Sequence, residues 1–365
     1  YLSNDHPLYH LSGVAVAYKL IEALYESLPK VPTQPLSNLL DLVAIGLVAD
    51  LVQLSGDCRY LAQMGIEELK KKKRLGVRFL LEACKKEGDR PTDISFGIAP
   101  RINSISRIWG DVSKCVEMLT SNNPAHCQEL VSLAEEANNQ RKALQKKIHS
   151  QVKERINSID LSTSPILVLE DLDWHTGILG VVSGQIVQEY NRPVILLNVE
   201  GEIVRGSARS PQGIDLYSLI KGQEHLLNSF GGHPFAAGLS LPIGNLELFR
   251  ESLIQRFWHQ YGDISSKPIT VDLTLTISEL GQGLFRELKQ LEPYGMGNPA
   301  PKLLVKDCRF SHKYNANIRN RKGQKLQYLK SEFNLDENTV LFFANDTFNV
   351  NYAGDQYLEL FLSLI

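Results

Sequence analysis

The sequence lacks paired cysteines and long apolar runs. Its five cysteines include no Cys-x-x-Cys pair, and they are Cys58, Cys84, Cys115, Cys127 and Cys308. This scatter argues against a disulfide framework and against a thiolate zinc site, and it favours a reducing cytoplasm. No apolar run is long enough to cross a bilayer, and the first residues lack the basic-then-apolar order of a signal peptide. The sequence therefore predicts neither a membrane span nor a signal peptide.

The sequence also lacks an excess of positive charge. It has 39 Lys and Arg against 41 Asp and Glu, so any binding of nucleic acid has to come from a local groove. Its 365 residues are 43% hydrophobic and 22% charged, which is typical of a soluble protein that divides into two or three domains. Because the chain begins at Tyr1 rather than Met and stops at Ile365 within a strand-like segment, we expect a fragment.

The first part of the chain is predicted to be helical. Apolar residues recur at helical spacing over residues 12–27, and residues 39–54 are apolar nearly all round, which predicts a buried helix. The basic cluster at residues 70–74 is expected to be the solvated end of a helix that begins near Gly65, because cations suit a helix carboxyl end. Pro124 begins a predicted helix that continues to about Ile156 without an internal Gly or Pro. Such a helix is a rigid connector between two domains.

The second part of the chain predicts an α/β unit followed by a β domain. A strand at residues 166–169, a helix at 177–190 and a strand at 193–197 form a strand-helix-strand pattern. A further amphipathic helix, at residues 246–261, is expected to pack on the same sheet. Beyond Pro268 the sequence has strand-like segments at residues 269–275, 302–310, 339–343 and 356–364. Short strands with polar loops indicate a small β domain.

A glycine-rich octet is the most unusual local pattern. Residues 231–238 read Gly-Gly-His-Pro-Phe-Ala-Ala-Gly. Glycine accepts positive φ and leaves its N–H uncovered, so a glycine pair beside an imidazole is a plausible cradle for a phosphate or an oxyanion. The alternative is a tight turn between a helix and a strand, in which a backbone carbonyl binds His233.

Seven segments, in sequence order, resemble the RecJ family of single-stranded-DNA-specific exonucleases, which belongs to the DHH phosphoesterase superfamily. They are residues 11–17, 41–50, 98–103, 174–180, 206–210, 231–238 and 293–299. The resemblance implies an α/β fold with five parts. These parts are the carboxyl-terminal, helical remainder of a DHH domain at residues 1–122, a connector helix at 123–160, a DHH-associated substrate-binding domain with a mixed sheet at 161–267, a linking segment at 268–300 and a partial OB-like barrel at 301–365.

The resemblance also implies phosphodiester hydrolysis by a water bound to Mn²⁺ or Mg²⁺. Asp50 matches a metal ligand of the family and is therefore a candidate catalytic residue. From the residues alone, a salt bridge or a helix cap is the alternative, because a free carboxylate in this apolar stretch would be costly to bury. The other metal motifs of the family precede the segment that matches residues 11–17, and Pro7 argues against a local substitute built on His6. We therefore expect this polypeptide alone to be inactive.

Arg101, Asn103 and Arg107 match family residues that bind near the scissile phosphate. Guanidinium forks fit phosphate geometry, and an amide can orient a phosphate or sugar oxygen. The alternatives are arginines on a solvated loop, or arginines that bridge to acidic residues of the connector helix. His175 precedes a predicted helix whose first N–H groups suit a terminal phosphate. Its alternative is a packing role beside Trp174 at an interdomain seam.

The remaining site residues follow from the same resemblance. Ser207 and Arg209 are expected to bind the 5′-phosphate or the backbone, and a lone exposed Arg is the alternative. His233 is expected to be a catalytic residue that faces the phosphate from the side opposite the metal. Gly231 and Gly232 would let the backbone pass close by. The basic segment at residues 312–329 matches the family poorly, and it either follows a DNA backbone or forms a solvated hairpin.

The function implied by these residues is part of a 5′-to-3′ single-stranded-DNA exonuclease of DNA repair and recombination. Its ligand would be single-stranded DNA, and a single-strand-binding protein or a helicase is a candidate partner. We expect a cytoplasmic monomer with no membrane contact. Two alternatives remain: a phosphodiesterase of the same superfamily acting on oligoribonucleotides or cyclic dinucleotides, and a non-catalytic nucleic-acid-binding homologue.

Overall fold

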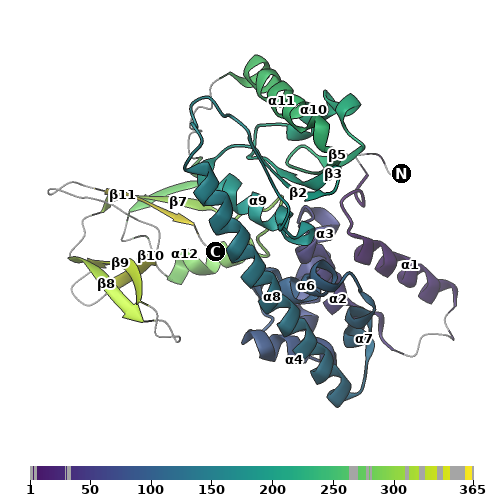
Figure 1. Ribbon diagram of the computed structural model, residues 1–365. Helices are drawn as coiled ribbons and strands as arrows, with labels where there is room; N and C mark the ends of the chain where they lie inside the picture. The colour runs from purple at the N-terminus through teal and green to yellow at the C-terminus, as the bar shows by residue number, and fades with distance from the viewer. Residues whose placement is uncertain are drawn as a thin grey trace. The chain divides into compact units, whose positions relative to one another are not determined.

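The computed structural model divides the chain into two compact units. It describes residues 3, 6–28, 30, 34–262, 270–276, 279 and 282–308, and beyond them four strands at 312–319, 325–334, 340–345 and 358–363. Unit 1 comprises Tyr1–Lys71, Gly88–Ile94 and Pro268–Ile365, and unit 2 comprises Lys72–Glu87 and Ser95–Lys267 (Figure 1). The division of the chain into five parts stays a prediction.

Unit 1 contains a small group of helices. They are α1 (Gly13–Ser27), η1 (Leu36–Leu39), α2 (Leu40–Ala49) and α3 (Gly56–Leu69), with the short α5 (Pro91–Asp93). α2 is buried along most of its length, as its almost wholly apolar sequence predicts. α3 approaches it closely at Gly65, where a Cβ would lie 2.2 Å from the Leu40 carbonyl oxygen. The shared core of α1, α2 and α3 includes Tyr18, Leu47 and Leu61.

The basic cluster at residues 70–74 follows a helix that starts earlier than predicted. α3 begins at Gly56 rather than near Gly65, because Cys58 and Leu61 already bury their side chains in its first turns. Lys70 and Lys71 lie directly after the helix and pair with glutamates three residues earlier. Both lysine side chains remain exposed, as expected for a solvated helix end.

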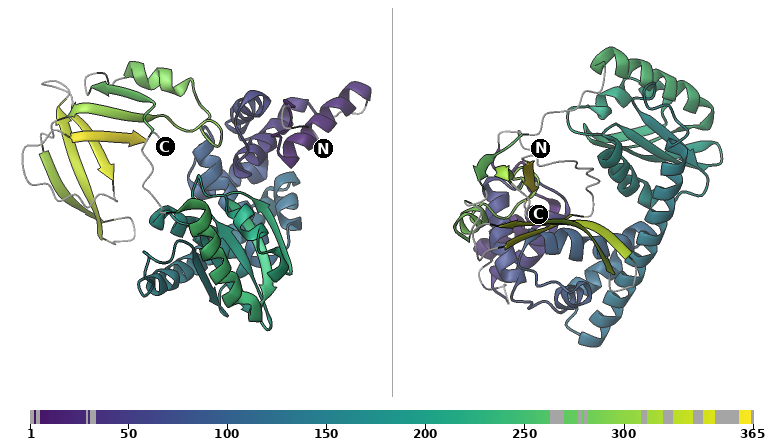
Figure 2. Two further views of the ribbon diagram at one scale, coloured as in Figure 1. Left: turned by 90° about the horizontal axis from the view of Figure 1, so that it is seen from above. Right: turned by 90° about the vertical axis from the view of Figure 1, so that its left-hand side faces the viewer.

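Unit 1 also contains two three-stranded sheets (Figure 2). One sheet has the order β11-β7-β6 and the other β10-β9-β8. A helix, α12 (Gln282–Lys289), lies between β6 and β7 in the sequence. The strands are β6 (Leu273–Thr276), β7 (Lys302–Cys308), β8 (His312–Arg319), β9 (Lys325–Asn334), β10 (Val340–Asn345) and β11 (Leu358–Ser363). β8 and β9 pair antiparallel within the basic segment, and the choice between a DNA-binding segment and a solvated hairpin stays open.

Unit 2 is organised around a long helix. α8 (Pro124–Ile156) has 33 residues and extends about 50 Å. Asn123 caps it by accepting hydrogen bonds from two N–H groups of its first turn, and Pro124 occupies the first helical position. α8 contacts α4 (Leu75–Cys84), α6 (Ala99–Trp109) and α7 (Ser113–Thr120) along one part and α9 (Thr176–Tyr190) along another. A long helix is therefore present where the sequence predicts one, and its role as a connector between two domains stays a prediction. A single-turn π-helix, η2 (Ile94–Ile98), leads into α6.

The sheet of unit 2 is mixed, as predicted. Its order is β1-β2-β3-β5-β4, with β1 and β2 parallel and every other pair antiparallel. α9 connects the parallel pair, as the strand-helix-strand pattern indicates. The strands are β1 (Leu167–Asp171), β2 (Val194–Glu200), β3 (Ile203–Arg209), β4 (Ser229–His233) and β5 (Ala236–Pro242). Strands β3, β4 and β5 were not predicted as strands from the sequence.

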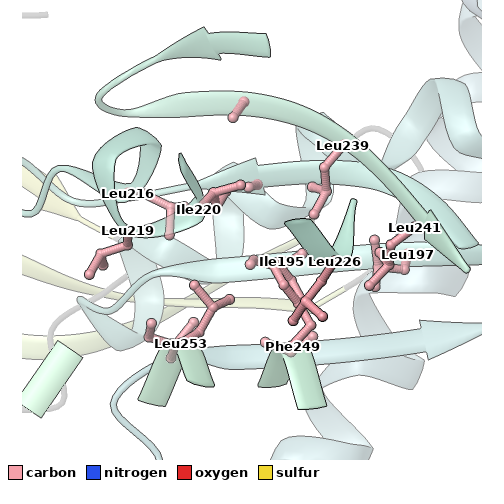
Figure 3. Close-up of a cluster of buried hydrophobic side chains, with 14 of the residues drawn as sticks. Ile195, Leu197, Leu216, Leu219, Ile220, Leu226, Leu239, Leu241, Phe249 and Leu253 are labelled. Carbon is pink, nitrogen blue, oxygen red and sulfur yellow. The ribbon is translucent and has the colours of Figure 1, made fainter. Parts of the chain in front are cut away.

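Helices cover both faces of this sheet (Figure 1). α8 and α9 pack on one face against β1 and β2, through residues such as Ile178, Val194 and Leu196. α10 (Leu216–Lys221) and α11 (Leu246–Tyr261) pack on the other face, with two 3-10 turns, η3 (Glu224–Leu226) and η4 (Ile243–Asn245), between them. Figure 3 shows the core of that second face, where Ile195 of β2 and Leu239 of β5 belong to the same buried cluster as Phe249 of α11. Among the helices that the structure describes, none has both the length and the hydropathy needed to cross a membrane.

Candidate functional site

Three neighbouring strands bring predicted site residues onto one face of the mixed sheet. β3 pairs in register with β5, and β5 pairs in register with β4, so each residue of β3 from Arg205 to Arg209 lies across β5 from a residue of β4. Paired residues of antiparallel strands, and residues two apart along a strand, point to the same face. Three rows result, and we call them together the open face: Arg209-Ala236-His233, Ser207-Gly238-Gly231 and Arg205-Ser240-Ser229.

α9 meets the β3 edge of the open face through a glycine. A Cβ added to Gly180 would lie 2.8 Å from Nη2 of Arg209 and 3.2 Å from Oγ of Ser207. The helix packs beside both side chains in their present positions because residue 180 has no side chain. The segment at residues 174–180 was recognised from the sequence, but this role of Gly180 was missed.

The start of α9 is defined by His175. Its Nδ1 accepts a hydrogen bond from the Gly177 N–H at 3.2 Å and so caps the helix. Trp174 is 1% exposed, and its indole N–H donates to Gln151 of α8 at 3.1 Å. The sequence left two alternatives for His175, a place at a helix end or a packing role beside Trp174. In the structure Trp174 is the residue that packs against α8, and His175 is half-buried at the start of α9.

Arg107 and Arg209 bring two positive charges to the same place. Nη1 of Arg107, in the last turn of α6, donates to the Gly177 carbonyl oxygen at 3.1 Å. Burial, and then the charge of Arg107, lower the pKa of Arg209 below its ordinary value. Within the described part of unit 2, neither guanidinium forms an ion pair with a carboxylate. The two cations are therefore available to an external anion.

Arg141 of α8 is a third guanidinium that the sequence did not single out. It donates to Asn138 Oδ1 at 3.0 and 3.2 Å and to Gln145 Oε1 at 2.7 Å. Burial lowers its pKa, and so do the charges of Arg107 and Arg101. Nothing in the sequence separates Arg141 from the other basic residues of α8, because only the fold places it near α6.

The predicted group Arg101, Asn103 and Arg107 is split by the geometry of α6. Arg101 is 8% exposed, forms an ion pair with Glu135 of α8 and donates from Nη1 to the Gly97 carbonyl oxygen at 2.8 Å. This is the bridge to the connector helix that the sequence left open. Asn103 and Arg107 are four residues apart and so share another side of the helix.

The two glycines before His233 differ in what the fold requires of them. Gly232 has φ +144°, and a Cβ there would lie 2.2 Å from the Ala236 carbonyl oxygen. Gly231 would meet nothing within 4 Å. The octet forms a hairpin between β4 and β5 rather than the turn between a helix and a strand that the sequence suggested. His233 is exposed on β4, the edge strand, and no described residue hydrogen-bonds its ring.

Comparison with known proteins matches two segments of the chain to domain families and most of the chain to curated relatives. Residues 163–259 match the DHHA1 domain family, and residues 271–361 match the RecJ OB domain family. The chain is 31% identical over 308 residues to the single-stranded-DNA-specific exonuclease RecJ of Bacillus subtilis, which covers 83% of the chain and 38% of that protein. It is 32% identical over 294 residues to the same exonuclease of Thermus thermophilus, which covers 80% of the chain and 42% of that protein. The chain is RecJ-like.

Solved structures extend the likeness to the fold. The crystal structure of T. thermophilus RecJ in complex with Mg²⁺ has a TM-score of 0.79 at 24% identity, and it covers 97% of the RecJ-like chain and 56% of that protein. The corresponding structure with Mn²⁺ has a TM-score of 0.77 at 25% identity, with 97% and 53% covered. The RecJ-like chain spans about 38% to 55% of the length of the curated RecJ relatives that it matches.

Asp50 lies in unit 1, apart in the sequence from the residues of the open face. It is the exposed C-cap residue of α2, so the expected cost of burying its carboxylate does not arise. In the part of the RecJ-like chain that the structure describes, no group of three or more His, Cys, Asp or Glu side chains could hold a metal ion. A hard divalent cation takes several oxygen ligands. Asp50 offers a single carboxylate group, so the described residues do not by themselves form a complete Mn²⁺ or Mg²⁺ site.

Proposed function

We propose that this chain holds the 5′-terminal phosphate of a DNA single strand on the open face, as part of a single-stranded-DNA-specific exonuclease. The proposal follows the name of the matched RecJ relatives. It is supported by the residues of unit 2 that converge near the start of α9. The reaction would be hydrolysis of phosphodiesters from the 5′ end of the strand.

The observation that carries the proposal is the proximity of two like charges, the guanidinium groups of Arg107 and Arg209. Two like charges repel each other, and burial increases the cost for Arg209, whose pKa is lowered by both effects. A terminal phosphate carries up to two negative charges and accepts hydrogen bonds in the geometry that guanidinium groups offer. Such a ligand would offset the repulsion that the protein by itself leaves uncompensated.

Neighbouring groups would complete the phosphate site. The hydroxyl of Ser207 lies beside Arg209 on β3, and the first turn of α9 presents N–H groups and a partial positive charge. Because Nδ1 of His175 accepts the Gly177 N–H, the proton of a neutral ring is on Nε2, which can donate to a phosphate oxygen. His233 would contact the same strand from β4.

The proposal includes Mg²⁺ or Mn²⁺, since the matched T. thermophilus RecJ structures are described in complex with these ions. Asp50 would be one of the ligands. Such an ion lowers the pKa of a bound water and neutralises charge in phosphoryl transfer. Asp50 supplies only one carboxylate, whereas such an ion takes several oxygen ligands. This polypeptide is expected to bind a strand and to cleave it poorly by itself.

The direct test compares single-stranded oligonucleotides with a 5′-phosphate and with a 5′-hydroxyl, using fluorescence anisotropy. We expect the 365-residue chain to prefer the 5′-phosphate by about tenfold, the effect of one charge-assisted contact. Arg209→Gln should remove this preference. Lys153→Gln is the matched control, because Lys153 is a half-exposed cation that pairs with Glu189 near the other end of α9. Equal affinity of the unaltered chain for both oligonucleotides would contradict the proposal.

A salt titration separates a strand from a smaller ligand. Binding through several phosphates should weaken with a log-log slope of about −0.7 per phosphate. A cyclic dinucleotide would give a shallow slope, and that outcome would favour the phosphodiesterase alternative. The role in repair and recombination, the cytoplasmic location, the monomeric state and the candidate protein partners stay predictions from the family resemblance.

A further inference from the structure

The open face continues beyond Ser207 into a cavity of about 320 Å³. This volume is at the lower end of the range of ligand pockets. The lining consists of one guanidinium, four hydroxyl groups, an aliphatic residue and a glycine, and it includes no carboxylate. The lining residues are Thr176, Arg205, Gly206, Ser207, Ser229, Leu239 and Ser240. We call this space the Arg205 cavity.

The register of the sheet connects the Arg205 cavity to the proposed phosphate site. Arg205 and Arg209 are four residues apart on β3, which corresponds to about 13 Å. Ser207 lies between them and belongs to both places. The row of Ser207 continues into Gly238 and Gly231, where a Cβ would meet almost nothing. A DNA strand that is held at Arg209 can therefore pass over these glycines to Arg205.

The chemistry of the cavity is that of a phosphate contact. Proteins bind DNA phosphates with Arg, Ser and Thr side chains, backbone N–H groups and helix N-termini. The Arg205 cavity has Arg205, hydroxyl groups from three strands, and Thr176 at the first position of α9. Its lining contains no aromatic side chain on which a base could stack. The cavity is therefore suited to the backbone of a strand rather than to a particular base.

One carboxylate competes for Arg205. Glu200 of β2 lies 3.4 Å from Nε of Arg205, with 51% of its side chain and 53% of the arginine exposed. Exposed pairs of this kind contribute little to stability, because water and salt screen them. Arg205 can thus exchange Glu200 for a phosphate at small cost, and Glu200 should oppose that exchange.

We infer that the Arg205 cavity binds an internal phosphodiester of the single strand whose 5′-phosphate lies at Arg209. The inference rests on the proposed function and adds a second, sequence-independent contact to the same strand. It makes Arg205 a binding residue that holds the strand along β3. The occupant is a DNA backbone phosphate, one of the first few from the 5′ end.

The first experiment measures binding of 5′-phosphorylated single-stranded DNA by two pairs of variants. Arg205→Gln should weaken binding by about tenfold and reduce the magnitude of the log-log salt slope by about 0.7. Glu200→Gln should strengthen binding by about threefold, because it releases Arg205. Lys153→Gln and Glu189→Gln are the controls, since they make the same charge changes in the exposed pair near the other end of α9. Neither control should change binding by as much as twofold.

The second experiment locates the phosphate. A neutral methylphosphonate replaces one linkage at a time among the first four from the 5′ end. We expect one linkage at which the replacement weakens binding of the unaltered chain by about tenfold and of Arg205→Gln hardly at all. Equal penalties in both proteins at every linkage would overturn the inference, and so would a Glu200→Gln effect no larger than that of Glu189→Gln.

Different measurements test the proposed function and the role of Arg205, so either can be contradicted without the other. Loss of the preference for a 5′-phosphate reports on Arg209 and on the proposed function, whereas the linkage scan reports on Arg205. We expect Arg205→Gln to keep the 5′-phosphate preference and to unfold at the same urea concentration as the unaltered chain, because its side chain is half-exposed. A lower unfolding midpoint with an unchanged salt slope would assign Arg205 to folding and overturn the inference.

Discussion

Substitution of Gly231 or Gly238 by alanine tests whether the open face lacks side chains at these positions because a ligand binds there. They pair across β4 and β5. A Cβ at Gly231 would meet nothing within 4 Å, and a Cβ at Gly238 would meet only the Gly206 carbonyl oxygen at 3.9 Å. Alanine thus fits the fold at either position and restricts the unfolded chain. We expect Gly231→Ala and Gly238→Ala each to raise the free energy of unfolding by about 0.4–1 kcal/mol.

The same variants should bind DNA less well. Each new methyl group would protrude from the sheet where the proposed strand lies. Overfilling a close contact costs about 1–3 kcal/mol, which corresponds to a loss of affinity of about fivefold or more. Urea unfolding measures the first effect, and anisotropy with a 5′-phosphorylated oligonucleotide measures the second. The prediction is therefore a gain in stability together with a loss of binding.

Two further glycine variants are the controls for this experiment. Gly184 of α9 also has nothing within 4 Å of its Cβ position, so Gly184→Ala should stabilise the fold and leave binding unchanged. Gly232 has φ +144° and a Cβ position 2.2 Å from the Ala236 carbonyl oxygen, so Gly232→Ala should lower the free energy of unfolding by about 1–3 kcal/mol. If Gly231→Ala and Gly238→Ala bound DNA as Gly184→Ala does, the reasoning would be refuted.

Two more predictions concern the edge of the open face and α6. Gly180→Ala would place a Cβ 2.8 Å from the end of the flexible Arg209 side chain, so we expect an unchanged unfolding midpoint in urea and a 5′-phosphate preference reduced about tenfold. A full preference in this variant would show that Arg209 does not need its present position. Arg101→Gln should lower the free energy of unfolding by about 1–3 kcal/mol, because it leaves Glu135 without its partner. Arg107→Gln should weaken binding and change the free energy of unfolding by less than about 0.5 kcal/mol. Urea unfolding and anisotropy measure the two effects. Weaker binding by Arg101→Gln together with a loss of stability in Arg107→Gln would contradict the different roles assigned to these two arginines of α6.

Long periodic segments were predictable from the sequence, and the strands of the open face were not. The helix of α8 follows from Asn123, Pro124 and a run without internal Gly or Pro. β3, β4 and β5 were missed because Gly206, Gly231 and their neighbours interrupt the alternation that marks a strand. The pairing of β3 with β5 is non-local, because α10 and the whole of β4 lie between these strands in the sequence. The rows of the open face were therefore beyond reach of local patterns.

The site residues were predictable as a set, and their individual roles were not. Resemblance identified Arg101 and Arg107 together, but helical phase directs Arg101 to Glu135 and leaves Arg107 beside Gly177. Asp50 was expected to be costly to bury, yet it lies at an exposed helix end. No sequence motif identified Arg205 as a site residue, because its proposed role depends on the position opposite Ser240 of β5 that strand pairing gives it. These roles depend on register and helical phase, which short motifs do not encode.

The distribution of carboxylates decides which arginines can bind an anion. The chain has a formal net charge of −2, so its overall field does not attract DNA. Arg155 and Arg250 are held by Asp171 and Glu170, and Arg101 by Glu135. Within the described residues no carboxylate pairs with Arg107, Arg141 or Arg209, and burial and then the charge of Arg107 lower the pKa of Arg141 and that of Arg209. A cationic site thus arises in a nearly neutral protein because its acidic residues pair with other arginines.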